Sequence, residues 1–332
     1  MLLNIDNRRI IFVGGKGGVG KTSIASSLAV ARAQQGARVL VVSTDPAHNL
    51  GHLWHHSVGD MPVRLVDATT PGWQGAGAID GVEIDPAATV ERHLAAVEAT
   101  MIRMLPERLH SQTRAHLERA RHAPGSHESA VLERIAEAAA TSRGEYDVVI
   151  FDTAPSGHTL RLLALPGQLT DWTETLLRNR DRSERYSAAM RSLAGRQHPE
   201  SDADAQLRRV LHQRKERFEG LRTAITDASS TGFVVVSTAE AMPVAETIEV
   251  IDALTALHVD IAGLVVNRRS PLNAGTLLAR RRAQEDHYLQ MLKAHSPAIP
   301  LIEVPLMAEE VAGLSGLSSV ARVLRGSEQK EA

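Results

Sequence analysis

The sequence contains no cysteine in 332 residues. Disulfide bonds, thiolate zinc sites, thiol redox switches and a cysteine nucleophile are therefore excluded. Aromatic residues make up only 3% of the chain, and no unbroken apolar run approaches the roughly 18 residues that a membrane-spanning helix needs. An excess of one charge is also lacking, because the formal net charge is -2. Nothing in this balance indicates general affinity for nucleic acids.

We expect no signal sequence either, because the N-terminus enters an apolar strand pattern without a basic stretch followed by an apolar one. We therefore expect a cytoplasmic protein without stable membrane insertion. The length allows a large core, and we expect residues 1–332 to form a single elaborated domain.

Short apolar runs that are typical of strands recur along the chain. They occupy residues 10–14, 38–45, 147–152, 232–238, 261–267 and 300–306. Most are unbroken rather than alternating, as expected for strands buried on both faces of a parallel sheet. Helical segments separate them, which predicts an α/β fold with a doubly wound, mostly parallel sheet and ligands at the carboxyl ends of the strands.

Two intervals, residues 86–143 and about 167–230, are too long for simple crossovers. Both are helix-rich and charged, and we expect them to form one inserted α-helical subdomain. The tail, residues 326–332, is expected to be disordered. The first insert has an apolar stripe at helical spacing: Val90, Leu94, Val97, Met101, Met104, Leu105 and Leu109. Packing between helices explains this stripe, and the wall of a hydrophobic client groove is the alternative.

Residues 14–23, "GGKGGVGKTS", join the first strand to a helical segment and match the phosphate-binding P-loop pattern Gly-x-x-x-x-Gly-Lys-Thr. Glycines let several backbone amides converge on one phosphate, and the helix that follows adds its positive end. The predicted nucleotide-binding residues here are Gly15, Lys16, Gly17, Gly18, Val19, Gly20, Lys21, Thr22 and Ser23. Lys21 is expected to reach the β- and γ-phosphates of ATP, and the Thr22 hydroxyl to bind Mg²⁺.

Two aspartates end predicted strands and complete this chemistry. Asp152 is the candidate for holding Mg²⁺, and we expect it to act through a water molecule. Asp45 could orient or deprotonate the attacking water, or it could equally cap the next helix. Pro155 and Gly157 form a predicted turn that could respond to the γ-phosphate.

Three stretches together, "GKGGVGKT", "TDPAHNL" and "FDTAPSGHTLRLLALP", resemble the ArsA family of arsenical pump-driving ATPases and the related targeting ATPases for tail-anchored membrane proteins. The resemblance runs from about residue 8 to 325. It continues through "VVNR" at 265–268 and "PLMAEEVAGLSGL" at 305–317, and it is weak in both inserts.

This resemblance implies a dimer that closes on two ATP molecules, a homodimer or a heterodimer with a paralogue. Lys16 would reach across the interface to the partner's phosphates, unless it is a surface lysine with local contacts only. Asp45 would belong to switch I as the residue that positions water, so that the implied catalytic residues are Lys16, Lys21 and Asp45. Switch II would comprise Asp152, Thr153, Pro155, Gly157 and His158. Asn267 would recognise adenine, and Pro305 would begin the loop beside the base.

The sequence departs from the family in two ways. Arsenite-responsive members bind the metalloid through cysteine, so direct metalloid sensing by this chain is disfavoured. The zinc-binding Cys-x-x-Cys of the eukaryotic targeting ATPases would fall near residues 275–278 and is missing. His48, His52, His55 and His56 have partly helical ligand spacing, but solvated histidines without a metal are the commoner case.

The sequence thus predicts an ATPase that uses ATP and Mg²⁺ and transmits dimer closure to a partner. The favoured partner is a membrane transporter for arsenite or another anion. The alternative is a hydrophobic client, shielded by a targeting factor for tail-anchored proteins. A positioning ATPase similar to MinD or ParA is a weaker alternative, because it would need a C-terminal amphipathic helix or a basic DNA-binding face.

Overall fold

The computed structural model describes most of the chain, and it divides the chain into two compact units. Described are residues 3–45, 49–104, 110–111, 114–115, 117–118, 121, 126–141, 144–154 and 202–326. The first unit comprises residues 1–85, 138–161 and 224–332, and the second comprises 86–137 and 162–223.

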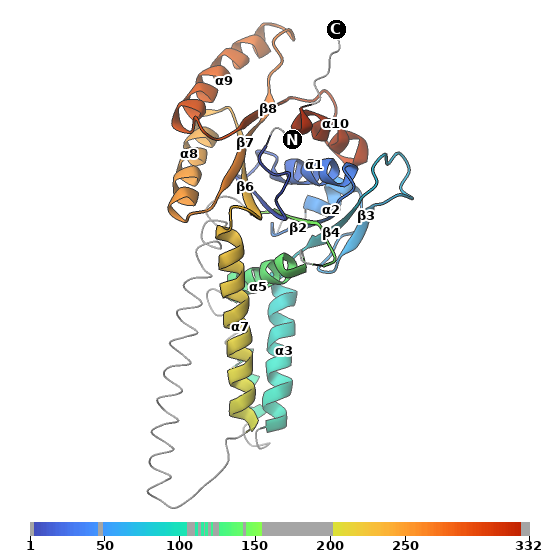
Figure 1. Cartoon of the computed structure of the whole chain (residues 1–332), viewed down its shortest axis with the longest axis vertical. Helices are drawn as coiled ribbons and strands as arrows, with labels where there is room; N and C mark the ends of the chain where they lie inside the picture. The colour runs from blue at the N-terminus through green and yellow to red at the C-terminus, as the bar shows by residue number, and fades with distance from the viewer. Residues whose placement is uncertain are drawn as a thin grey trace, which may run out of the picture. The chain divides into compact units, whose positions relative to one another are not determined.

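The first unit is built on one eight-stranded sheet with the order β3-β4-β2-β5-β1-β6-β7-β8 (Figure 1). Its strands are β1 (Ile10–Gly15), β2 (Arg38–Ser43), β3 (Val63–Val66), β4 (Ala78–Glu83), β5 (Val148–Asp152), β6 (Thr231–Thr238), β7 (Ile261–Arg269) and β8 (Leu301–Pro305). All neighbours pair in parallel except β3, which runs antiparallel to β4. The doubly wound, mostly parallel sheet predicted from the apolar runs is confirmed.

Two of these strands, β3 and β4, were not predicted. Asp80 and Gly81 interrupt the apolar pattern of β4, and β3 has only four residues, one of them an arginine. Gly81 is needed for packing, because a Cβ there would lie 2.7 Å from the Leu65 Cδ1 atom on β3. The predicted strand 38–45 is also too long by two residues, since β2 ends at Ser43.

Helices cover both faces of the sheet. On one side lie α1 (Lys21–Gln34), α2 (Asn49–Trp54) and α10 (Gly313–Arg325), and on the other α8 (Ala241–Ala256) and α9 (Thr276–His295) (Figure 1). The first group packs on the main core, to which Ile24 and Leu28 of α1 and Leu317 of α10 contribute. A smaller cluster lies beneath α8 and α9. The sheet is therefore buried on both faces, as its unbroken apolar strands require.

The described part of the second unit consists of helices. They are α3 (Pro86–Met104), most of α5 (Ser126–Thr141) and most of α7 (Asp202–Thr226), the last turns of α5 and α7 belonging to the first unit. Arg217 Nη1 of α7 pairs with the carboxylates of Glu133 at 3.1 Å and Glu137 at 3.6 Å on α5. Phe218 of α7 and Leu132 of α5 are buried.

The apolar stripe of the first insert is described only in part. Val90 is buried and Leu94 half-buried on α3. Of Val97, Met101 and Met104 the structure describes the helical backbone but not the side chains, and Leu105 and Leu109 lie outside the described residues. The joint subdomain of residues 86–143 and 167–230, the client groove and a disordered tail at 326–332 all stay predictions.

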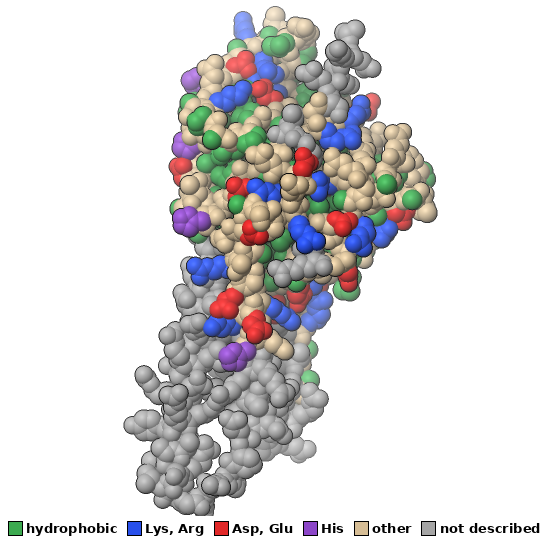
Figure 2. All heavy atoms as spheres, viewed as in Figure 1, with side chains coloured by type: hydrophobic (Ala, Val, Ile, Leu, Met, Phe, Trp, Pro, Cys, Tyr) green, Lys and Arg blue, Asp and Glu red, His purple; other side chains and the backbone are tan. Residues whose placement is uncertain are grey.

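Surface charge is mixed. Figure 2 shows acidic and basic side chains interspersed over the visible face of the described chain, in keeping with a net charge of -2. Within the described ranges, no helix combines the length and apolarity that a bilayer crossing demands.

Candidate nucleotide-binding and hydrolysis site

The loop between β1 and α1 needs glycine for its backbone shape. Gly15, Gly18 and Gly20 have φ angles of 150°, 81° and 94°, which side chains disfavour. A Cβ on Gly15 would lie 2.1 Å from the Val236 carbonyl oxygen, and one on Gly20 would lie 2.4 Å from Asn267 Nδ2. The loop therefore comes so close to β6 at Gly15 and to β7 at Gly20 that a side chain would not fit at either position. A cradle of this kind suits the close approach of phosphate oxygens.

Lys21, the first residue of α1, bends its side chain back over this loop. Its ammonium donates a hydrogen bond to the Lys16 carbonyl oxygen at 3.2 Å, and the residue is only 6% exposed. Burial lowers the pKa of Lys21, while the negative charges of Asp152 and Asp45 act in the opposite direction. A buried ammonium at this point can compensate phosphate charge directly.

Asp152 ends β5 next to the loop and is fully buried. Neither of its carboxylate oxygens has a hydrogen-bond partner of normal geometry in the described chain. Burial raises the pKa of Asp152 to about 7, although the nearby hydroxyls of Thr22 and Ser43 and the charge of Lys21 lower it. A buried carboxylate with unused oxygens, beside a threonine hydroxyl, is a donor set suited to a hard cation such as Mg²⁺.

Asp45 follows β2 at the same edge of the sheet and is half-buried. The preceding Thr44 donates its backbone N–H to the Asp152 carbonyl oxygen at 2.9 Å. The negative charges of both aspartates raise the pKa of Lys21, so Asp45 lies in the neighbourhood of the P-loop lysine. The next three residues, including His48, lie outside the described part of the chain.

Lys16 has a contact that sequence reasoning did not find. Its ammonium pairs with Glu246 Oε1 of α8 at 2.7 Å, and both side chains are partly exposed. The two residues are 230 positions apart, so no local pattern could have revealed the pair. In this arrangement the lysine is held by its own chain.

Asn267 and Arg268, near the end of β7, bind the backbone of the P-loop between β1 and α1. Asn267 Nδ2 donates to the Val19 carbonyl oxygen at 2.9 Å, and Arg268 Nη1 donates to the Gly18 carbonyl oxygen at 3.1 Å. The adenine role of Asn267 stays a prediction. Arg268 was missed, although consecutive arginines directly after a buried strand were a visible signal.

Pro305 ends β8, directly beside Arg269 in the sheet register. Arg269 is only 1% exposed, and its guanidinium pairs with Glu285, Asp286 and Glu303. The Leu306 N–H donates to the Arg269 carbonyl oxygen at 2.8 Å. The loop predicted to flank the base is thus joined to a buried ion network that reaches α9.

The predicted residues that are described gather at the carboxyl ends of β1, β2, β5, β7 and β8. Thr153, of the predicted switch II, donates its hydroxyl to the Val13 carbonyl oxygen at 2.8 Å. Pro155, Gly157 and His158 lie outside the described residues.

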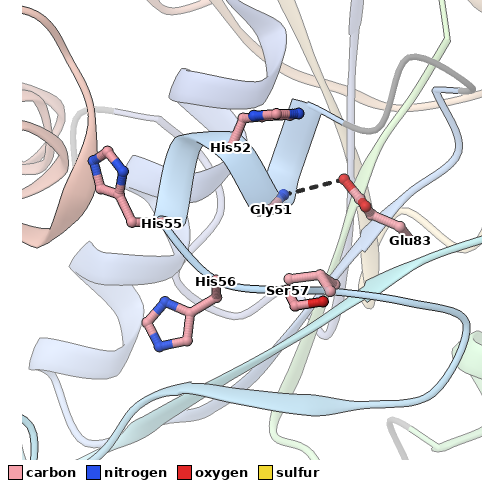
Figure 3. Close-up of a pocket in the computed structure, with 7 residues that line it drawn as sticks. Gly51, His52, His55, His56, Ser57 and Glu83 are labelled. Atoms are coloured by element: carbon pink, nitrogen blue, oxygen red, sulfur yellow. Dashed lines mark hydrogen bonds between the residues drawn. The ribbon is translucent and has the colours of Figure 1, made fainter.

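The histidine run lies around a cavity of about 460 Å³ beside α2 (Figure 3). His52, His55 and His56 line it, but their rings point in different directions. His56 Nδ1 is 2.7 Å from the Trp54 carbonyl oxygen. Among the described residues, no group of three potential metal-ligating side chains forms.

A glycine loop between a central strand and a helix, with a lysine and a strand-end aspartate beside it, defines a P-loop nucleotide hydrolase. The family model described as "Anion-transporting ATPase" matches residues 8–326. The chain therefore belongs to the ArsA ATPase family, and it is an ATPase that binds nucleotide.

Named relatives cover nearly the whole chain. "ATPase GET3" of Pyricularia oryzae is 30% identical over 329 residues, 97% of this chain and 92% of the relative. "Putative arsenical pump-driving ATPase 2" of Aquifex aeolicus is 28% identical over 321 residues, 95% of this chain and 99% of the relative. "ATPase ASNA1 homolog 1" of Paramecium tetraurelia is 28% identical over 316 residues, which cover 95% of this chain and 91% of the relative.

Proposed function

We propose that this chain hydrolyses ATP to ADP and phosphate with Mg²⁺, as a homodimer that closes on two nucleotides and couples closure to a partner. The observation that carries the proposal is Asp152, a fully buried carboxylate without a hydrogen-bond partner of normal geometry, beside the P-loop. Such a group is costly unless a ligand that the chain itself lacks satisfies it.

Thr22 and Asp152 are the residues proposed to hold Mg²⁺, the latter through water. When bound, the ion supplies positive charge to the phosphate oxygens. The P-loop amides and the Lys21 ammonium bind and orient the phosphates from the protein side. Asp45 holds the attacking water and accepts its proton at the carboxylate.

Lys16 is proposed to act on the nucleotide of the partner subunit, where an added positive charge stabilises the transferring phosphoryl group. It must first leave Glu246, which it contacts at 2.7 Å. Asn267 and Pro305 are proposed to line the adenine pocket, next to the loop that Asn267 supports.

A membrane transporter for an anion is the proposed partner, in line with the family description. Without cysteine the chain lacks the usual ligands for arsenite, so the transporter would bind the anion itself. A second candidate is a hydrophobic client of the kind handled by tail-anchored protein targeting ATPases, shielded by the helical inserts at 86–143 and 167–230. The ATPase itself would work in the cytoplasm.

The dimer is tested by measuring turnover per subunit against protein concentration, with light scattering in a non-hydrolysable ATP analogue. The proposal expects specific activity to rise with concentration and the analogue to double the molar mass. Constant specific activity from a monomer that stays monomeric would overturn the dimer and leave the P-loop assignment standing.

The partner class is tested by adding arsenite, antimonite or a solubilised tail-anchor peptide to the same assay. Stimulation by the peptide alone would favour the targeting candidate over the transporter. Direct stimulation by arsenite would contradict the argument from the missing cysteines.

A further inference from the structure

We infer that Glu83, at the end of β4, is a positioning residue for Asp45 in ATP hydrolysis. The inference rests on the proposed function, because it takes Asp45 as the residue that holds the attacking water. Glu83 lies on a strand that sequence reasoning missed, and nothing in its local pattern marks it as part of the site.

Glu83 fixes the start of α2. Its Oε1 atom accepts hydrogen bonds from the backbone N–H groups of Leu50 at 2.8 Å and Gly51 at 3.1 Å. Figure 3 shows the carboxylate directed at the Gly51 amide from the neighbouring strand. The residue is only 4% exposed, so these bonds form away from bulk water and are charge-assisted.

The chain just before Asp45 is also fixed, by hydrogen bonds between Thr44 and the end of the central strand β5. Thr44 donates its N–H to the Asp152 carbonyl oxygen at 2.9 Å, and its hydroxyl accepts a hydrogen bond from the Ala154 N–H at 3.2 Å. Asp45 therefore directly follows Thr44, which is bonded to Asp152, the last residue of β5. It precedes Leu50, which is bonded to Glu83, by five residues. We call these two contacts the anchors of Asp45.

Both anchors belong to one rigid frame. β4 pairs with β2 in parallel, and Glu83 stands opposite Ser43 in the register. The Ile84 N–H donates to the Ser43 carbonyl oxygen at 3.0 Å, and the Glu83 N–H donates to the Gly59 carbonyl oxygen at 2.9 Å. The backbone of Glu83 is therefore fixed to β2, the strand that ends two residues before Asp45.

Because Asp45 lies on the short stretch between these two contacts, they restrict where its carboxylate can lie relative to the attacking water. A general base must lie within hydrogen-bond reach of its water, and displacement by about 1 Å can reduce rate a hundredfold. A mere cap on α2 would affect stability alone. A positioning role would lower kcat and leave ATP binding intact, because the P-loop hydrogen bonds described above run to Glu246, Asn267 and Arg268.

The first test compares Glu83→Gln with wild type in turnover and in binding of a fluorescent ATP analogue. We expect kcat to fall by about tenfold or more, with KM and analogue affinity within about twofold of wild type. Glu133→Gln is the matched control, because Glu133 is a buried carboxylate that pairs with Arg217 in the helical unit. Its kcat should be unchanged.

A second comparison asks whether Glu83 acts through Asp45. In single turnovers followed over hours with excess enzyme, adding Glu83→Gln to Asp45→Asn should cause little further loss, because the side chain to be positioned is already disabled. Full multiplication of the two losses would overturn the inference.

Other outcomes are equally decisive. Unchanged kcat in a folded Glu83→Gln protein, or parallel losses of kcat and analogue affinity, would refute positioning. If that protein does not fold, Glu83→Asp, which keeps the charge but is one methylene shorter, takes its place in the same assays. Robust turnover by Asp45→Asn alone would instead refute the proposed role of Asp45, whatever the Glu83 variants do.

Discussion

At the scale of a single residue, Asp152 is a carboxylate for which burial disfavours the charged form. The side chain is fully buried, and burial raises its pKa to about 7. We predict that Asp152→Asn stabilises the nucleotide-free protein at pH 8 by about 1–2 kcal/mol, because a buried charge is removed, while turnover is lost. Thermal denaturation without nucleotide checks the sign. A lower melting temperature for the variant would contradict it.

Asp227 gives a pH-dependent prediction outside the site. The hydroxyls of Ser229 and Ser230 and the Ser229 amide lower its pKa to about 2. A depressed carboxyl pKa stabilises the fold above the unfolded value near 4, and this contribution is lost as pH falls through 2. Asp227→Asn should therefore melt below wild type at pH 6, and the difference should disappear near pH 2. A difference that is independent of pH would show that the ionised carboxylate is not responsible.

Individual residues also show how far sequence reasoning reaches. Lys21 and Asp152 could be predicted, because a fixed spacing or a strand end marks each of them. Glu246 and Glu83 could not, because each acts on a segment distant in the sequence, 230 positions away for Glu246 and 33 or 32 for Glu83. Such pairs depend on the folded sheet.

At the scale of elements, β7, α9 and β8 are joined by the buried Arg269. The Arg269 guanidinium pairs with Glu285 on α9 at 2.9 Å and with Glu303 on β8 at 2.9 Å. Arg269→Ala should lower the free energy of unfolding by about 3 kcal/mol, because the buried Glu285 loses its buried partner and keeps the exposed Arg281. Arg281→Ala is the control, since this exposed arginine also pairs with Glu285 but should cost at most about 1 kcal/mol. Equal losses in urea titrations would contradict this difference.

The contact between the P-loop and α8 leads to a second prediction for elements. Glu246 holds Lys16 at 2.7 Å, so Glu246→Gln should release the lysine for the partner subunit. We expect half-maximal specific activity at a protein concentration several times lower than for wild type, a shift of about 1 kcal/mol or less for a partly exposed pair. An unchanged or higher concentration would mean that the pair does not restrain Lys16.

Elements differ in how well the sequence predicts them. β1, β5, β6 and β7 each contain an unbroken apolar run, and they lie where they were predicted within two residues. β4 was missed because it carries Asp80 at a partly exposed position and Gly81 where a side chain would clash. Its stability comes from pairing with β2 and β3, which a local window cannot detect.

At the scale of the whole molecule, the family match covers residues 8–326 and therefore includes residues of both units. The two units together thus belong to one ATPase. The α/β unit could be predicted because nucleotide chemistry imposes fixed residue types at strand ends. The helical unit could be predicted only as helical, because many sequences satisfy an amphipathic pattern.

The dimer yields the last prediction, made with two inactive proteins. In a Lys16→Ala subunit Asp45 is intact, and in an Asp45→Asn subunit Lys16 is intact. If Lys16 acts on the partner's nucleotide, a mixed dimer contains one complete site and one site lacking both groups. An equimolar mixture with random pairing should then recover about a quarter of wild-type turnover, because half of the dimers carry one working site of two.

If Lys16 acts only within its own subunit, every site in the mixture lacks one group and turnover stays at the level of the separate variants. Turnover per subunit at fixed total protein, measured while the ratio of the two variants is changed, distinguishes these cases. Exchange between subunits should give a maximum at equal amounts and decline to either side. A flat profile, with exchange verified by fluorescence transfer between labelled subunits, would place Lys16 outside the partner's site and return it to a local contact with Glu246.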